Sequence, residues 1–73
     1  MTNRLKDVFK HVFKLDEVSD DISQSNCEKW DSMGLLNLVV ELETEFDISF
    51  EPEEIATMKN FEIVKKMVEE KLR

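Results

Sequence analysis

Apolar residues recur every three or four positions along most of the chain, which is the spacing of one face of an α-helix. The first such stretch predicts a helix over residues 3–15. Its core face is formed by Leu5, Val8, Phe9, Val12 and Leu15. A second helix is predicted from about Ser32 to about Phe46, and a last one over residues 61–73 with Asn60 as its N-cap. Because only one Gly and one Pro interrupt the sequence, we expect helices throughout and no strands.

The segment between the first two predicted helices, residues 16–31, is long and polar. Val18 and Ile22 are its apolar positions, and we expect them to fasten it to the core. A loop of this length in so small a domain usually carries function, and this one leads directly to Ser32. Beyond the second helix, "EPEEIATM" predicts a short helix, because Pro52 is tolerated in a first helical turn and acidic residues are favoured there.

The second predicted helix is apolar on two sides. One stripe is the width of a core face and consists of Leu35, Leu38, Val39, Leu42 and Phe46. Met33, Leu36 and Val40 cluster about 140° away from it. A helix in a small bundle needs only one buried stripe, so the second is either covered by the neighbouring loop or offered to a partner. Glu43 lies near the same outward face, where it would suit a basic partner or simply face solvent.

Composition limits the function. The 73 residues form one small domain, residues 1–73, which leaves no room for an enclosed catalytic cleft. A net charge of −7 disfavours nucleic acid and anionic lipid and favours basic protein surfaces. The single cysteine, Cys27, cannot form an internal disulfide or hold a metal alone, which fits a reducing compartment. With neither a secretory signal nor a membrane span in the pattern, we expect a cytoplasmic monomer.

Ser32 allows two interpretations. It sits in "WDSM" at the start of the second helix, where Ser and Asp are favoured as N-caps, so helix capping is the simpler one. The other is that its hydroxyl is presented for modification by another protein. Catalysis by the chain itself is not indicated, because the sequence has no nucleophile, base and oxyanion set, no Gly-rich phosphate loop and no metal cluster. A calcium loop starting at Asp16 is rejected because Asp21 stands where Gly is required. The lone His11 is expected on the surface.

The stretch "DSMGLLNLVVELETEF" resembles the Asp-Ser-Leu motif and second helix of acyl carrier proteins, and the order of elements matches that family over essentially the whole chain. The resemblance implies an all-α, four-helix bundle with three main helices, a short third helix and a long loop between the first two. It also implies that Ser32 is the attachment point of 4′-phosphopantetheine, transferred from coenzyme A by a separate magnesium-dependent phosphopantetheinyl transferase. The thiol of that arm would carry acyl groups as thioesters, and the carrier itself would catalyse nothing.

Further roles follow from the same resemblance. Asp31 would help to position the transferase, and Met33, Leu36 and Val40 would contact acyl-loading ligases and synthase or transferase enzymes with basic docking patches. An acyl chain would lie between the second and third helices, although each residue there can equally be ordinary core. These pocket residues are Leu42, Phe46, Ile55, Met58 and Phe61.

The sequence also departs from the family pattern. Gly34 and Asn37 stand where carriers of primary fatty acid synthesis usually have acidic residues, so the partner set is expected to be specialised. With Trp30 before the motif, the sequence "WDSM" resembles that of stand-alone carriers of secondary metabolism or lipid modification more than that of the main fatty acid carrier. The alternative is a small acidic helical interaction domain without a prosthetic group, in which Ser32 only caps the helix. Covalent modification of Ser32 separates the two.

Overall fold

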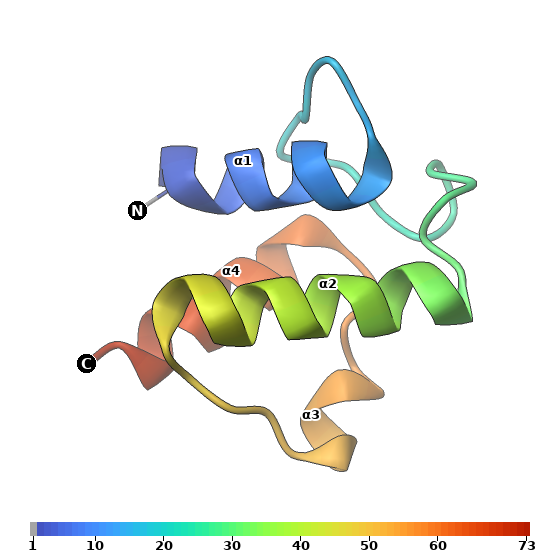
Figure 1. The fold of residues 1–73 in the computed structure, drawn as a ribbon. Helices are drawn as coiled ribbons and strands as arrows, with labels where there is room; N and C mark the ends of the chain where they lie inside the picture. The colour runs from blue at the N-terminus through green and yellow to red at the C-terminus, as the bar shows by residue number, and fades with distance from the viewer. Residues whose placement is uncertain (1) are drawn as a thin grey trace.

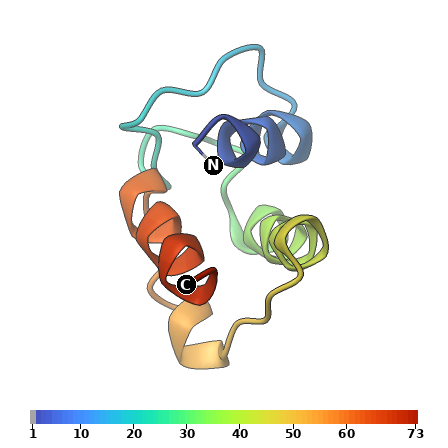
Figure 2. The same ribbon diagram turned by 90° about the vertical axis from the view of Figure 1, so that its left-hand side faces the viewer.

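The computed structural model describes residues 2–73, which contain four helices joined by loops (Figure 1). They are α1 (Thr2–Phe13), α2 (Ser32–Phe46), α3 (Pro52–Ile55) and α4 (Phe61–Lys71). α1 and α2 run antiparallel and pack along each other. Figure 2 looks nearly along these two helices and shows α4 opposite them, with the short α3 below. The expected all-α bundle with a short third helix and a long first loop is therefore confirmed.

Both α1 and α2 are followed directly by a residue with left-handed backbone conformation. Lys14 has a φ of 53° and Asp47 a φ of 55°. In each case the next residue donates its N–H five positions back, from Leu15 to the Lys10 carbonyl at 3.0 Å and from Ile48 to the Glu43 carbonyl at 3.3 Å. The first helix thus ends two residues before the predicted end at Leu15. The short helix and the last helix are also shorter than predicted, ending at Ile55 and Lys71.

The core is dominated by aromatic side chains at the α1 side of the bundle. Phe9 makes edge contacts with Phe13, Trp30 and Phe61 at centroid distances of 5.8, 5.4 and 5.1 Å. Phe13 and Trp30 stack on each other at 5.4 Å. Such pairs contribute about 0.5–1.5 kcal/mol each beyond their buried area. The periodicity did not assign Phe13 to the core face, yet it is fully buried, because it lies one turn beyond Phe9 on the same side of α1.

The long loop between α1 and α2 is fastened to the core as expected. Val18 and Ile22 are buried, and so is Cys27, which has no disulfide partner in the described chain. The loop is also held to the segment before α4 by backbone hydrogen bonds. The Phe61 N–H donates to the Ile22 carbonyl at 2.9 Å, and the Gln24 N–H donates to the residue 59 carbonyl at 3.0 Å. These contacts fix the path of the chain as it approaches α2.

Candidate functional site

Ser32 is the first residue of α2 and is exposed, but it is not the helix cap. That role belongs to Asp31, which has extended backbone angles and accepts a hydrogen bond from the Gly34 N–H at 2.8 Å through Oδ1. The Asp31 carbonyl accepts the Leu35 N–H at 2.8 Å, closing the first turn. The Ser32 hydroxyl makes no hydrogen bond to any residue between 2 and 73. Capping therefore explains Asp31 and leaves the Ser32 hydroxyl available.

The start of α2 offers a favourable environment for an anion on the Ser32 oxygen. The first N–H groups of a helix have no partner within it, and Asp31 takes up only that of Gly34 with its side chain. The N–H groups of Ser32 and Met33 remain for solvent or a ligand. The first turn of α2 carries no acidic residue, but the Asp31 carboxylate at the N-cap partly offsets the positive end of the helix dipole, so the free N–H groups of Ser32 and Met33 are what remains to bind an anion. A phosphate ester at Ser32 fits this arrangement.

Gly34 and Trp30 set the angle at which the loop enters α2. A Cβ added to Gly34 would overlap the carbonyl oxygen of Lys29 and lie 3.1 Å from Cε1 of Phe13. Only glycine lets the preceding loop approach the helix so closely. Trp30, next in the chain after Lys29, is buried and stacks on Phe13. From the sequence, Gly34 was expected to make the docking helix less acidic, whereas in the structure the glycine is explained by packing against Lys29 and Phe13. An isolated glycine inside a predicted helix was the sequence feature that could have indicated such a close approach.

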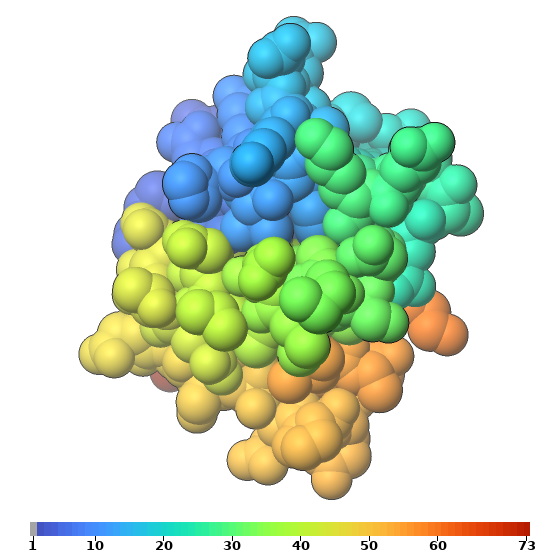
Figure 3. All heavy atoms as spheres, turned by 45° about the vertical axis from the view of Figure 1, so that its right-hand side comes forward, coloured from blue at the N-terminus to red at the C-terminus, as the bar shows by residue number. Residues whose placement is uncertain are grey.

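The second apolar stripe of α2, which the periodicity left either covered by the loop or exposed, lies on the surface. Met33, Leu36 and Val40 are 68%, 54% and 59% exposed. Figure 3 shows α2 as a band across one face of the molecule, between α1 and the segment that contains α3. Since Ser32 begins this helix, the stripe starts beside the free hydroxyl. Binding of a partner by these three residues stays a prediction.

Glu43 differs from the other residues proposed for docking. It is half-buried, and its Oε2 accepts a hydrogen bond from the Phe50 N–H at 3.0 Å, in the chain that leads to α3. Its carboxylate is therefore already bound within the protein. A docking role for Glu43, which stays a prediction, would require that this hydrogen bond be shared or broken.

The predicted acyl pocket residues belong to one continuous core. Leu42, Met58 and Phe61 are fully buried, Phe46 is buried, and Ile55 is half-buried against the same cluster. The structure thus brings all five together, while their burial is what core packing alone would give. Two open cavities of about 250 and 400 Å³ lie elsewhere, along the groove between α1 and α2, and both are lined by His11 and Glu41.

Residues 2–73 show no sign of a metal site or of a membrane-spanning helix. No group of three or more His, Cys, Asp or Glu side chains in this range could hold a metal ion. Within the same range, no helix is both long and apolar enough to cross a membrane. His11 is exposed, as expected.

Comparison with known proteins places the chain in a family. Neither a scan against protein-family models nor a search of curated proteins gives a match. Among solved structures, the chain is similar to the solution NMR structure of holo acyl carrier protein from Geobacter metallireducens, with a TM-score of 0.86 and 30% sequence identity. The match covers 96% of this chain and 83% of that one. Acyl carrier proteins are carriers without catalytic activity. The chain therefore belongs to the acyl carrier protein family.

Proposed function

We propose that the protein carries acyl groups as thioesters on a 4′-phosphopantetheine arm attached to Ser32. The observation that carries the proposal is the exposed, unbonded Ser32 hydroxyl at the start of α2, with the capping role taken by Asp31. The holo form of the similar acyl carrier protein supports the same group here.

The local structure suits the chemistry of attachment. The Ser32 Oγ would attack a phosphorus atom of coenzyme A, form a phosphodiester and release 3′,5′-ADP, while the hydroxyl proton passes to a base of the transferase. The transferase would also supply the magnesium ion. The N-terminus of α2 would stabilise the negative charge of the phosphodiester, and Asp31 would hold the turn and contact the transferase. When bound, the arm supplies the thiol that holds the acyl group.

Docking would combine the apolar stripe of α2 with overall charge. Met33, Leu36 and Val40 would enter apolar clefts of partner enzymes, which are the transferase, an acyl-loading ligase and synthase or transferase enzymes. The net charge of −7 would attract basic docking patches on these enzymes. A tether raises the effective concentration of the cargo, so such contacts can stay weak and exchange between partners.

The finer assignments belong to the same proposal. The acyl chain would be sheltered among Leu42, Phe46, Ile55, Met58 and Phe61. A specialised lipid or secondary-metabolite pathway is supported by Trp30 before the motif and by the uncharged Asn37 on the exposed side of α2. The unpaired Cys27 supports a reducing cytoplasm, and we expect a monomer of one domain.

Intact-protein mass spectrometry tests the proposal. The purified chain is incubated with coenzyme A, magnesium and a broad-specificity phosphopantetheinyl transferase, together with Ser32→Ala and with Ser49→Ala, which removes another exposed serine. We expect one added phosphopantetheine on the wild type and on Ser49→Ala, and none on Ser32→Ala. A wild type that is folded by circular dichroism but unmodified would overturn the proposal. The exposed stripe of α2 would then favour the interaction-domain alternative.

A further inference from the structure

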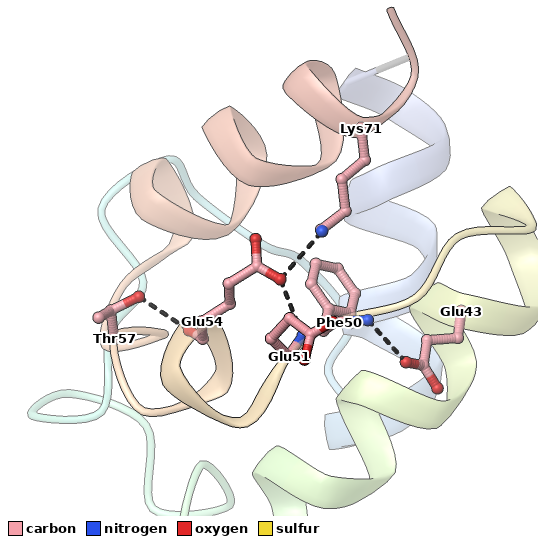
Figure 4. Close-up of polar contacts among 6 residues, drawn as sticks. All are labelled: Glu43, Phe50, Glu51, Glu54, Thr57 and Lys71. Carbon is pink, nitrogen blue, oxygen red and sulfur yellow. Dashed lines mark hydrogen bonds and ion pairs between the residues drawn. The ribbon is translucent and has the colours of Figure 1, made fainter.

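The two flanks of the apolar stripe of α2 differ in what they offer a partner. At about 100° per residue, Glu43 lies on one flank of the stripe and Glu41 on the other. On the flank toward α3, the Glu43 Oε2 accepts the Phe50 N–H at 3.0 Å (Figure 4). Glu54 of α3 is paired with Lys71 at 2.9 Å in the same region. Both carboxylates are therefore already engaged within the protein.

The flank toward α1 is a groove that contains an unpaired carboxylate. Two open cavities of about 250 and 400 Å³ lie along this groove, and Glu41 lines both. Glu41 is half-buried and has no polar partner among residues 2–73. A carboxylate that is partly removed from water gains most from a partner that supplies both a hydrogen bond and a positive charge.

The helix α1 adds a second carboxylate to the same groove. Asp7 is 75% exposed, and its Oδ1 lies 4.0 Å from the Lys10 Nζ, at the long limit of an ion pair. Arg4 also lines the groove, but its Nε and Nη2 both lie 3.0 Å from the Glu45 Oε2. Arg4 and Glu45 thus offset each other, which leaves Asp7 and Glu41 to attract a cation.

The groove is continuous with the apolar stripe. Val40 belongs to the stripe and also lines the smaller cavity, together with Val12 of α1. Along α2, Glu41 lies about 14 Å from Ser32, at 1.5 Å per residue. A transient partner covers about 600 Å² of each protein, a patch about 28 Å across. An enzyme that acts on Ser32 and covers the stripe can therefore also reach the groove.

We propose that α1 takes part in docking: the transferase that modifies Ser32 sits on the apolar stripe and places one Lys or Arg side chain in the groove, where Glu41 and Asp7 bind its charge. This role of α1 rests on the proposed carrier function. A Lys or Arg side chain suits the groove, because its apolar stem lies against Val12 and Val40 while its charged end reaches the carboxylates.

Transferase kinetics test the groove. The rate of mass gain is measured with saturating coenzyme A and varied carrier concentration, at low ionic strength. Glu41→Gln should raise the KM for the carrier about five- to tenfold with kcat unchanged, the effect of losing one charged hydrogen bond made on docking. His11→Lys should raise the KM by a similar factor, because His11 lines both cavities and a lysine there brings a permanent positive charge.

Matched controls change the same charges on the α3 side. Glu53→Gln and Ala56→Lys alter exposed residues, and Glu53 has no polar side-chain contact to any of residues 2–73. Both controls should keep the KM within about twofold of the wild type, since only the long-range attraction is reduced. A KM that is unchanged in Glu41→Gln or in His11→Lys, or raised as much by the controls, would overturn the role of α1.

A docking footprint gives a second test on an unaltered groove. Isotope-labelled Ser32→Ala, which cannot be modified, is titrated with the transferase and coenzyme A, and its amide resonances are followed by NMR. Amides of residues 7–12 and 37–41 should shift or broaden, whereas those of residues 53–57 should not. Changes confined to α2 and residues 53–57 would refute the role of α1 alone. A wild type that gains no mass would refute the carrier proposal and this role with it.

Discussion

Replacement of Gly34 by alanine tests whether the entry to α2 depends on a close backbone approach. Helix propensity alone predicts that alanine stabilises the helix by about 1 kcal/mol. The structure predicts the opposite, because the new Cβ would overlap the Lys29 carbonyl oxygen and lie 3.1 Å from both the Lys29 carbonyl carbon and Phe13 Cε1. The sign of the change therefore decides between propensity and packing.

The expected magnitude follows from what has to move. The overlapping atom belongs to the backbone, so no side-chain rotation relieves it, and shifting Lys29 disturbs Trp30, which stacks on Phe13. Inserting an extra methyl group into packed structure costs about 1–3 kcal/mol, and a backbone collision belongs at the upper end. After the propensity gain, we expect a net loss of about 2 kcal/mol, which lowers Tm by about 8–16 °C in a chain of this size.

Urea unfolding measures this change, because Trp30 is the only tryptophan and is buried in the region that the substitution disturbs. Asn37→Ala is the matched control: it is exposed on the same helix and should gain about 0.5 kcal/mol from propensity. A Gly34→Ala protein that is as stable as the wild type, or more so, would refute the argument that Lys29 requires a glycine there.

Three further predictions concern the helix ends and the contacts of Glu54. Lys14→Gly should raise stability by about 0.5 kcal/mol in the urea titration, because glycine adopts a φ of 53° without left-handed strain; a loss would contradict this. Asp31→Ala should lower the free energy of unfolding by about 1 kcal/mol, whereas Asp31→Asn keeps the helix cap. If the transferase recognises the charge of Asp31, both variants should be modified more slowly; if only the cap matters, Asp31→Asn should be modified as fast as the wild type. The pKa of Glu54 lies below its ordinary value of 4.5 because the Glu51 N–H and Lys71 bind the carboxylate. The stabilisation by Glu54 is thus complete above pH 4.5 and lost as pH falls through the lowered pKa. Stability followed by circular dichroism should therefore fall less steeply on acidification in Glu54→Gln than in the wild type. An equally steep fall in both proteins would count against the contact.

The helices could be predicted from periodicity, but their ends could not. Leu5, Val8 and Phe9 were assigned to the core from spacing alone, and all three are buried. The end of α1 depends instead on Lys14 in a left-handed conformation, which propensity gives no reason to expect of a lysine. Helical spacing reports which face is apolar, whereas termination depends on hydrogen bonds to the residues that follow.

The position of the candidate site was predictable, and the roles around it were not. The motif predicted Ser32 as the candidate residue and a cap at the start of this helix, but it gave the capping role to Ser32, whereas Asp31 caps the helix in the structure. That Gly34 is required by the Lys29 carbonyl depends on the path of the backbone, which no local pattern contains. The contact of Glu43 with the Phe50 N–H likewise depends on how the chain returns after α2. Such pairings arise from tertiary packing, so they become visible only in the folded structure.

The contacts of the α2 carboxylates in the folded structure change what the sequence implies about docking. Its charged residues are three glutamates, at positions 41, 43 and 45. Glu43 is bound by the Phe50 N–H, and Glu45 is paired with Arg4 at 3.0 Å, whose Nη2 also donates to the Glu45 carbonyl at 2.8 Å. Only Glu41 keeps a carboxylate without a polar partner among residues 2–73, so a docking enzyme meets less free charge on α2 than the sequence suggests. Since the net charge of −7 acts at longer range, we expect charge to govern the rate of encounter, and the exposed apolar stripe to govern how long the complex lasts.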